Sequence, residues 1–471
     1  ERLRHLRGEG RADALLILSG RPRGMVRDLW SRLAASYGTP NHFDFDVRKG
    51  GGLRCASRLM LGFEDVPAYD WGRIRLAVSF GAPLLAGGCR SIHLARHPFA
   101  YGDARPRIVQ VEPSYSRAAA HADEWISLAP GSYAALALAI AHVIVRDELF
   151  DQAFVAQHTS GFEDWRDAEG VAHRGFREHV LDGYAPESVA GLCGVPAGRI
   201  EALARELGTS RSAVVVLDAA ASQSREGLQA AQAVLAVNAL LGNVQSLGGI
   251  VDQQPVPLAP WPALVADEVA ETSRQREPVV RPNLFGDTAI DRLPEGLVAG
   301  GDARVDTVIL DYANPCYSAP NPERWRRALA DVPFVVTTSP FLDESCDEVA
   351  DLVLPEHTYL ERFEDAAATA GTGLAVMGVF QPAVEPLYDT RATGDVIIDL
   401  AKAIGGTVAE AFPWKGFRYA FAQRALGIHR AQRGSIVASS PKAFFRDLFR
   451  EGFWTEDAAF GAPVEPSFSN P

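Results

Sequence analysis

The stretch that decides the fold is RIVQVEPSYSRAAAHADEWISLAPGSYAALALAIAHVIV, residues 107–145. Its first residues, 107–113, form a short apolar run rich in β-branched side chains, which is typical of a buried strand in a parallel sheet. Its last residues belong to a longer apolar segment, 132–150, which we expect to form a helix with Ser132 as the N-cap. Alternation of such strands and helices indicates an α/β fold.

The same alternation runs through most of the chain. Further strands are predicted at residues 14–20, 76–82, 213–219, 306–312, 333–339 and 350–356, and further helices at 225–243, 322–332 and 393–406. This is more strands than one doubly wound sheet usually holds. We therefore expect two Rossmann-like domains with mainly parallel sheets, one inserted in the other.

Composition excludes several classes of protein. The chain has 471 residues, of which 47% are hydrophobic, so it can bury a large core. Its net charge of −13 argues against nonspecific binding of nucleic acid, because phosphate recognition needs surplus Lys and Arg. No window of 18 apolar residues predicts a membrane span. Five scattered cysteines without a C-x-x-C pair indicate neither a zinc knuckle nor an iron–sulfur motif within the chain.

Polar residues follow several of the predicted strands. In open parallel sheets, ligands bind at the carboxyl ends of the strands and near helix N-termini. Each of these loops alone is an ordinary strand-to-helix turn, but five of them in one chain suggest a large, extended polar ligand. No G-x-G-x-x-G follows a strand and no G-x-x-x-x-G-K-[ST] is present, which disfavours NAD and nucleoside triphosphates. The loops contain Gly81 and Ala82; Glu112; Pro130, Gly131 and Ser132; Asn314 and Pro315; and residues 337–345.

A lone cysteine, Cys55, lies in GGGLRCASRLMLG, residues 50–62, between a glycine-rich turn and an expected helix. It could be a nucleophile or a ligand for a soft metal, with a thiolate stabilised by the helix N-terminus, Arg54 and Arg58. The stretch alone favours a small buried hydrophobe, which is what most lone cysteines are. A hydrolase would also need a partner histidine, for which no spacing singles out one candidate. The candidate histidines are His121, His142, His158 and His357, and the cysteines expected only to pack are Cys89, Cys193, Cys316 and Cys346.

Read in order, these loops resemble one family. The segments that carry the resemblance are GTPNHF (38–43), Cys55, SFGAPLL (79–85), 109–145, HTSGFEDW (158–165), 238–249, ANPCYSAPNPERW (313–325), 350–364 and 386–405. Together they are similar to the molybdopterin oxidoreductases of the dimethyl-sulfoxide-reductase superfamily. The similarity is greatest to the polysulfide, thiosulfate and tetrathionate reductase branch and its quinone-linked relatives.

The resemblance implies a bis(molybdopterin guanine dinucleotide) cofactor with Mo or W, and it implies Cys55 as the protein ligand of the metal. Apart from the resemblance, Arg54 and Arg58 could steer an anionic substrate, or they could be solvated charges at the end of the helix. Glu112 stands where the family has Asp in V-D-P-R, and Ser114 replaces the Arg of that motif. The implied cofactor contacts are Gly81, Ala82, Glu112, Pro130, Gly131, Ser132, Asn314, Pro315, Ser339 and Ser345.

The resemblance also implies a domain layout. Residues 1–49 and 256–430 would form an outer Rossmann-like domain, and residues 50–255 an inserted one that starts at the metal-ligand loop. Residues 431–471 would be a linker towards a further C-terminal domain. The proline-rich stretch 252–283 would lie at the crossing, close to an active-site funnel. We expect the chain to be a fragment whose 4Fe-4S cluster belongs to a domain before residue 1.

The implied activity is two-electron redox chemistry on a small sulfur-type substrate in anaerobic respiration. The implied partners are an iron–sulfur electron-transfer subunit and a membrane subunit linked to quinone, in a periplasmic or membrane-associated complex, with no nucleic acid and no direct membrane span. The alternative is a cofactor-poor structural or electron-transfer subunit of a quinone-linked membrane complex. Formate chemistry is not supported, because no histidine stands beside Cys55.

Overall fold

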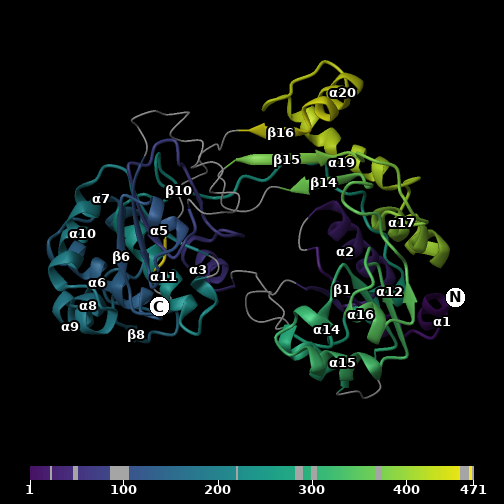
Figure 1. Cartoon of the computed structure of the whole chain (residues 1–471), viewed down its shortest axis with the longest axis horizontal. Coiled ribbons are helices and arrows are strands. Elements are labelled where there is room, and N and C mark those ends of the chain that lie inside the picture. The colour runs from purple at the N-terminus through teal and green to yellow at the C-terminus, as the bar shows by residue number, and fades with distance from the viewer. Residues whose placement is uncertain are drawn as a thin grey trace. The chain divides into compact units, whose positions relative to one another are not determined.

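The computed structural model describes residues 1–21, 24–45, 51–84, 106–218, 221–281, 290–298, 305–367, 374–456 and 466–468 (Figure 1). The chain divides into two compact units. Unit 1 comprises Glu1–Val47, Val256–Ala368 and Val376–Glu456, and unit 2 comprises Arg48–Pro255, Thr369–Ala375 and Asp457–Pro471. Among the described residues, no helix is both long and apolar enough to cross a membrane.

Unit 1 is built on a five-stranded sheet with the order β13-β12-β11-β1-β2, in which every neighbouring pair is parallel. Alternate residues of each strand face opposite sides. Leu16 and Leu18 pack into a cluster with Trp325 of α15 (Pro322–Ala330). The helices α2 (Met25–Tyr37) and α17 (Thr393–Ile404) pack against each other, and α2 contacts β1. The strands are β1 (Leu15–Ser19), β2 (His42–Asp44), β11 (Thr307–Asp311), β12 (Phe334–Thr337) and β13 (Leu352–Val353).

Residues after 430 do not form the expected linker within the described part of unit 1. The strand β16 (Phe453–Glu456) joins β14 (Glu364–Ala367) and β15 (Ala375–Phe380) in a second, three-stranded sheet. The helix α20 (Pro441–Glu451) precedes it and buries Phe444 and Leu448 on one face. An amphipathic helix and a strand therefore stand where the sequence suggested irregular chain.

The other helices of unit 1 are short or lie around these sheets. They are α1 (Arg2–Gly8), α2 (Met25–Tyr37), α12 (Glu268–Arg274), α13 (Leu293–Val298), α14 (Pro315–Ser318), α15 (Pro322–Ala330), α16 (Glu344–Glu348), α17 (Thr393–Ile404), α18 (Gly406–Glu410) and α19 (Phe417–Ala431).

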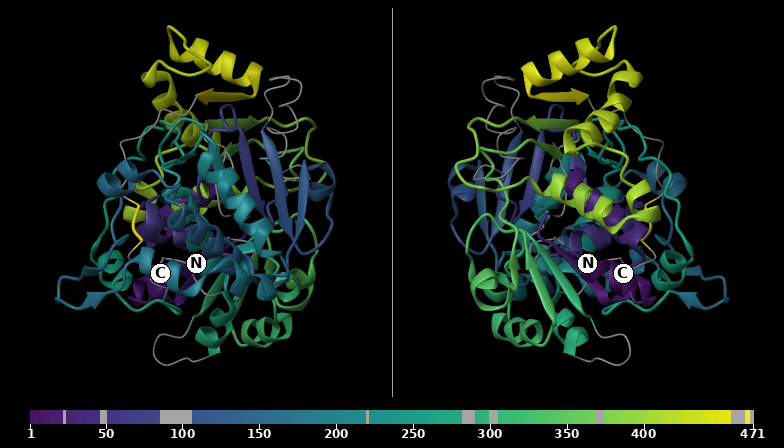
Figure 2. Two further views of the ribbon diagram at one scale, coloured as in Figure 1. Left: turned by 90° about the vertical axis from the view of Figure 1, so that its left-hand side faces the viewer. Right: turned by 90° about the vertical axis from the view of Figure 1, so that its right-hand side faces the viewer.

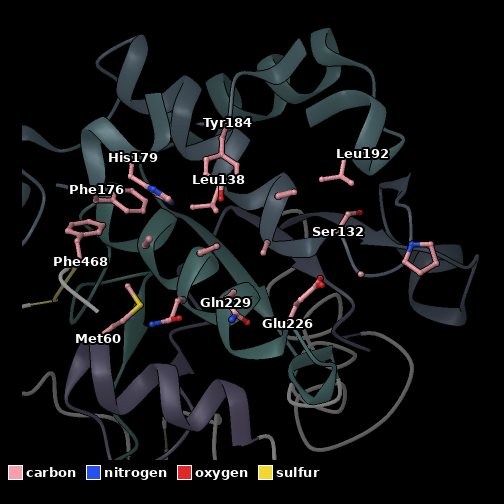
Figure 3. A pocket seen from close by; sticks show the side chains of 17 residues that line it. Met60, Ser132, Leu138, Phe176, His179, Tyr184, Leu192, Glu226, Gln229 and Phe468 are labelled. Carbon is pink, nitrogen blue, oxygen red and sulfur yellow. The ribbon is translucent and has the colours of Figure 1, made fainter. Parts of the chain in front are cut away.

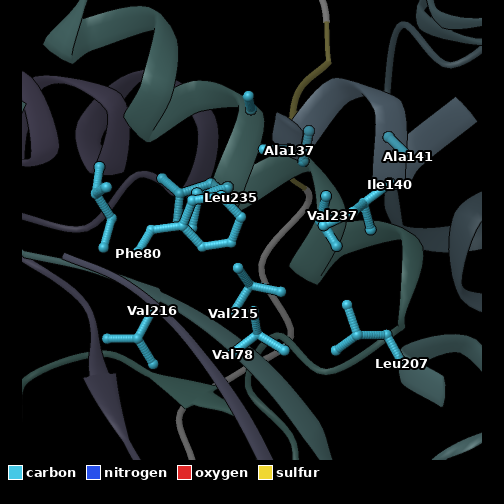
Figure 4. Packing of buried hydrophobic residues seen from close by; sticks show 14 of the residues in the cluster. Val78, Phe80, Ala137, Ile140, Ala141, Leu207, Val215, Val216, Leu235 and Val237 are labelled. Atoms are coloured by element: carbon cyan, nitrogen blue, oxygen red, sulfur yellow. The ribbon is translucent and has the colours of Figure 1, made fainter. Parts of the chain in front are cut away.

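Unit 2 is built on a four-stranded, fully parallel sheet with the order β6-β5-β4-β9. Its strands run side by side in Figure 2. Helices α6 and α11 pack together on this sheet, and Figure 4 shows Val78 and Val215 beneath Leu235 and Ala137. The strands are β4 (Leu76–Phe80), β5 (Arg107–Glu112), β6 (Glu124–Ser127) and β9 (Ala213–Leu217).

Small residues on α6 and α11 let these helices lie close to the sheet and to each other, because alanine side chains leave little bulk between the backbones. The helices of unit 2 are α3 (Gly51–Leu61), α5 (Arg117–His121), α6 (Tyr133–Arg146), α7 (Gln152–His158), α8 (Phe176–Gly183), α9 (Pro186–Cys193), α10 (Ala197–Thr209) and α11 (Gly227–Leu240); its short strands are β3 (Ala68–Tyr69), β7 (Trp165–Arg166), β8 (Ala172–His173) and β10 (Ile250–Val251).

The predicted α/β class with mainly parallel sheets is confirmed, and all seven predicted strands are present. The strands β2 and β6 were not predicted. Both are short and carry polar residues, so neither makes a continuous apolar run. The proline-rich stretch contains the boundary between Pro255 and Val256, and its part within unit 1 includes α12.

Candidate functional site

The carboxyl ends of β4 and β5 bring three predicted residues together in unit 2. Gly81 and Ala82 follow β4 directly, and Glu112 is the last residue of β5. The carbonyl oxygen of Ala82 accepts hydrogen bonds from Ser79 Oγ at 3.0 Å and from Gln110 Nε2 at 3.1 Å. Because the strands are parallel neighbours, the loops after them share one edge of the sheet, where a ligand of such a fold would bind.

Glu112 is 8% exposed, and both of its carboxylate oxygens already have partners. Ser116, the N-cap of α5, donates to Oε1, and Gln110 Nε2 donates to Oε2 at 3.1 Å. The Glu112 carbonyl accepts from Trp125 Nε1 at 3.2 Å. These hydrogen bonds hold the Glu112 carboxylate in one orientation. A ligand that bound to this carboxylate would share it with Ser116 and Gln110.

The turn Pro130-Gly131-Ser132 leads into α6. Gly131 has a φ of +82°, a left-handed conformation that favours glycine. Ser132 is the N-cap residue as predicted, but its hydroxyl donates to the Ala129 carbonyl at 2.6 Å and, among the described residues, caps no α6 amide. The Ser132 hydroxyl therefore stabilises the turn and does not cap the helix.

Sequence reasoning missed Tyr133, the first residue of α6. A Cβ built on Gly81 would lie 2.7 Å from the Tyr133 hydroxyl oxygen, so the phenol occupies the space that the missing side chain of Gly81 leaves. The ring of Tyr133 also packs against Phe80, the last residue of β4, at 6.0 Å between centroids. Burial, together with the charge of Glu112, raises the pKa of Tyr133 to about 12, so the phenol is neutral at physiological pH.

A cavity of about 700 Å³ lies within unit 2 beside this turn. Figure 3 shows Leu138, Phe176, Tyr184 and Phe468 around it, with Ser132 and Glu226 at the end near the turn. Alanines of α6 and α11 make part of the wall. Its size and apolar lining are in the range of small-molecule sites.

Cys55 lies in the second turn of α3, because this helix already begins at Gly51. The expectation that the cysteine precedes the helix was wrong. The residues of α3 that face the apolar core are Leu53, Ala56, Met60 and Leu61. At about 100° per residue, Cys55 lies on the opposite side of the helix. It is nevertheless only 4% exposed.

The glycines before Cys55 have a packing role at one position. A Cβ on Gly52 would lie 2.5 Å from the Ser222 carbonyl oxygen and 3.0 Å from the Gly227 carbonyl carbon. Gly52 therefore lets α3 approach the start of α11, and the space beside it is filled by backbone rather than left for a ligand.

The two arginines beside Cys55 have carboxylate partners. Arg54 Nη2 lies 3.1 Å from Asp65 Oδ1, and Arg58 Nη2 lies 2.7 Å from Glu64 Oε2. The Glu64 side chain is 86% exposed, and an ion pair this exposed is easily exchanged for another anion.

Asn314 and Ser345 meet at the carboxyl edge of the unit 1 sheet. Asn314 follows β11 and is the N-cap of α14, in which Pro315 is the first residue. Its Oδ1 accepts from the Ser345 N–H at 3.2 Å and from the Ser345 hydroxyl at 2.8 Å. Its Nδ2 donates to Glu344 Oε2 at 2.7 Å, which lowers the pKa of Glu344. The predicted Asn314 and Ser345 therefore lie in one network.

Ser339 is close in sequence but has a different role. Its hydroxyl oxygen accepts from the Phe341 N–H at 3.2 Å, and the residue is 5% exposed. This bond shapes the loop after β12.

A ring of four charges at the same edge of unit 1, with Arg21 and Glu356 buried and Arg362 and Glu364 partly buried, was not predicted. Arg21 pairs with Glu356 and lies 3.6 Å from Glu364, and Arg362 pairs with Glu364 at 2.6 Å and lies 3.6 Å from Glu356. The Arg21 guanidinium lies 4.5 Å from the ring centroid of Tyr312, which has a φ of +52°. A positive φ is unusual for a residue other than glycine, and no pattern in the sequence predicts it for Tyr312.

The hydrolase alternative gains no support from two of its four candidate histidines. His142 Nδ1 lies 2.9 Å from the Val180 carbonyl oxygen, and His357 Nδ1 lies 2.6 Å from Thr390 Oγ1. Cys193, Cys316 and Cys346 are buried as expected, and Cys89 lies outside the described residues. No group of three or more His, Cys, Asp or Glu that could hold a metal is found in the described part of the chain.

A protein-family model described as molybdopterin oxidoreductase matches residues 88–403. The menaquinone reductase molybdopterin-binding-like subunit of Nitratidesulfovibrio vulgaris is 28% identical over 402 residues, which cover 83% of this chain and 52% of that protein. The thiosulfate reductase molybdopterin-containing subunit of Salmonella typhimurium is 27% identical over 402 residues, which cover 81% of this chain and 50% of that one.

The chain thus spans about half the length of the curated relatives it matches. Among solved structures, acetylene hydratase from Pelobacter acetylenicus superimposes with a TM-score of 0.72 at 18% identity, covering 97% of this chain and 63% of that one. This likeness concerns the fold.

Proposed function

This chain belongs to the molybdopterin oxidoreductase family, and from that premise we propose that it forms the Rossmann-like part of a catalytic subunit for two-electron redox chemistry. The substrate would be a small sulfur compound in anaerobic respiration. The family implies a molybdopterin cofactor with Mo or W, and we propose the bis(molybdopterin guanine dinucleotide) form. The observation that carries the proposal is that both parallel sheets end in polar loops at their carboxyl edges.

The residues present suit such a group in one respect. Gln110, which is fully buried, has a carbonyl oxygen without a hydrogen-bond partner among the described residues. An unpaired buried acceptor costs about 1–3 kcal/mol, and a ligand that donates to it would remove that cost.

We assign the following roles in this proposal. Cys55 would be the protein ligand of the metal, since a thiolate suits a soft, high-valent ion. Glu112, Gly131 and Ser132 in unit 2, and Asn314 with Ser345 in unit 1, would hold polar arms of the cofactor. The other contacts that we propose are Gly81, Ala82, Pro130, Pro315 and Ser339. When bound, the cofactor supplies the electron transfer to and from substrate, and the chain binds and orients.

Arg58 would attract an anionic substrate, because its exposed pair with Glu64 is weak enough to exchange. The proposed partners are an iron–sulfur electron-transfer subunit and a quinone-linked membrane subunit, in a periplasmic or membrane-associated complex. The curated relatives support this arrangement in that two of them are named as subunits.

One observation favours a second candidate, a subunit that has the fold but little or no cofactor. The phenol of Tyr133 stands in the notch at Gly81, where a ligand would have to enter. One relative is itself named molybdopterin-binding-like.

Metal analysis separates the two candidates. The full-length protein is purified from a host that makes the cofactor, and Mo and W per chain are measured by mass spectrometry. We expect close to one metal per chain, and a loss of at least fivefold in Cys55→Ala. Cys193→Ala is the matched control, because Cys193 is a fully buried thiol within the core of unit 2. Absence of Mo and W from the wild-type protein would contradict the proposal and favour the structural subunit.

A further inference from the structure

The apolar cavity of unit 2 is walled by several elements of the chain. Helices α6, α8, α9 and α11 all contribute lining residues, and α8 and α9 pack on α6. Another wall is Phe468, which is 5% exposed. Its N–H donates to the Ser160 carbonyl at 2.8 Å, and its ring stacks on that of Phe176 at 4.7 Å between centroids. The space is thus a pocket between elements and not the exposed face of one helix.

The helices α6 and α11 present small side chains to this cavity. Ala134 and Ala135 line it from α6, and Ala233 and Ala236 line it from α11. Close-packed interiors rarely keep a void larger than a water molecule, and a larger apolar residue at these positions would fill part of the space. The cavity of about 700 Å³ therefore offers an apolar molecule room that the chain itself leaves open.

The cavity is elongated, and its two ends differ. Phe176, His179 and Phe468 lie together at one end, whereas Glu226 lies at the other (Figure 3). Glu226 is the N-cap of α11, and Ala236 follows ten residues later on the same helix. Since an α-helix rises 1.5 Å per residue, the lining follows α11 for about 15 Å. A ligand that fills the cavity is therefore long, with an apolar end and a polar end.

Glu226 is the one lining residue with a charge at neutral pH within the described part of the chain. Burial and the charge of Arg174 hold the pKa of His179 below its usual range, so that imidazole is neutral. A Cβ on Gly131 would lie 3.8 Å from Glu226 Oε2, which places the carboxylate at the turn before α6. The Glu226 side chain is exposed, and among the described residues it has no ion-pair or hydrogen-bond partner. A carboxylate beside an apolar space attracts a positively charged group.

We propose that this cavity binds an amphipathic organic cation, a small molecule with an apolar body and one positively charged group. The body lies over the alanines of α6 and α11, and the charged group pairs with Glu226. The inference goes beyond the proposed function and does not depend on it. Among the described residues, none of β4 or β5 lines the cavity, which shares only residues 130–132 with the proposed cofactor contacts.

Three probes with the same ten-carbon chain test the proposal: decylamine, 1-decanol and decanoate. At pH 7 the amine is protonated, as a lysine side chain is, and decanoate is ionised. Binding of each probe to the full-length protein is measured by titration calorimetry. We expect decylamine to bind at least 10-fold more tightly than decanoate, with decanol between them. In Glu226→Gln, the affinity for decylamine should fall at least 5-fold, and the affinity for decanol should stay within 2-fold of the wild type.

A variant that fills the cavity separates binding there from binding elsewhere. Ala135→Phe places a ring in the space and should weaken the binding of decylamine and decanol at least 10-fold. Ala202→Phe is the matched control, because Ala202 is an exposed alanine of α10 outside the cavity lining, and it should bind both probes as the wild type does. Ala135→Leu replaces Ala135→Phe if thermal melting shows that the latter does not fold.

Three results would overturn the inference: no binding of decylamine, equal affinity for decylamine in the wild type and the filled variant, or equal affinities for decylamine and decanoate. None of them bears on the proposed function, which is tested by the metal content.

Discussion

At the carboxyl edge of the unit 1 sheet, Asn314, Ser345 and Glu344 are bonded to one another, whereas at the corresponding edge of unit 2 the hydroxyl of Tyr133 stands beside Gly81. The network of Asn314, Ser345 and Glu344 can exchange one hydrogen bond for another when a ligand arrives. The edge of the unit 2 sheet cannot exchange hydrogen bonds in this way. The Tyr133 side chain stands beside Gly81, and among the described residues the carbonyl oxygen of the Gln110 side chain lacks a donor.

The comparison teaches that the same arrangement of parallel strands can end in mutually bonded polar side chains in one sheet and beside an aromatic residue in the other. Strand ends alone locate both edges. The side chains that meet at each edge come from different loops, and these must be compared in space.

The largest effect is expected in the unit 1 network. Asn314→Ala removes three hydrogen bonds and leaves the buried Ser345 without one acceptor. We expect the free energy of unfolding to fall by about 3 kcal/mol. It is measured by urea denaturation, followed by a spectroscopic signal from unit 1. Asn321→Ala, which removes a single N-cap bond of α15, is the control and should cost about 1 kcal/mol. Equal losses of stability in the two variants would contradict the expectation that the Asn314 network contributes more than a single N-cap hydrogen bond.

A smaller effect is expected at the unit 2 edge. Gly81 has a φ of +64°, and an alanine there would also push against the Tyr133 hydroxyl. We expect Gly81→Ala to lower the free energy of unfolding by about 2 kcal/mol, of which about half comes from the backbone. Gly170 has a φ of +83° with nothing within 4 Å of a Cβ. Gly170→Ala should therefore cost only the backbone part, about 1 kcal/mol. If both variants lose the same amount, Tyr133 yields freely and blocks nothing.

An effect of similar size that appears only when the pH is changed is expected at Asp365. Asp365 accepts from the Met25 N–H at the start of α2, which follows β1 in unit 1. Burial raises the pKa of Asp365 to about 6, despite this hydrogen bond. The unfolded chain ionises near 4 and the folded one near 6, so the free energy of unfolding falls as the pH rises between these values. Relative to Asp365→Asn, the wild type should lose roughly 2 kcal/mol from pH 4 to pH 7.

Asp267 gives a control of opposite sign. Burial opposes its ionisation, but hydrogen bonds from Arg7, Thr407 and Ala270 outweigh it and hold the pKa of Asp267 at about 2. Its contribution is present above pH 4 and is lost as the pH falls towards 2. Asp267→Asn should therefore differ from the wild type by a constant amount between pH 5 and pH 7. A constant difference for Asp365→Asn as well would contradict the assignment for Asp365.

The sheets could be predicted because their strands are continuous β-branched runs, such as residues 107–113 and 213–219. The start of α3 could not be predicted, because consecutive glycines indicate a turn. Only the structure shows that Gly52 packs against the carbonyl oxygen of Ser222. The obstruction by Tyr133 depends on a notch at Gly81, far away in the sequence, so no local pattern contains it. The predictions for Cys55 as metal ligand and for the cofactor contacts remain predictions.

The central claim is that Cys55 is the protein ligand of a pterin-bound metal, and X-ray absorption at the metal edge tests it most directly. The measurement compares the loaded full-length protein with Cys55→Ala, reconstituted to measurable occupancy. The account predicts one sulfur fewer in the first coordination shell of the variant. The same number of sulfur ligands in both proteins would contradict it.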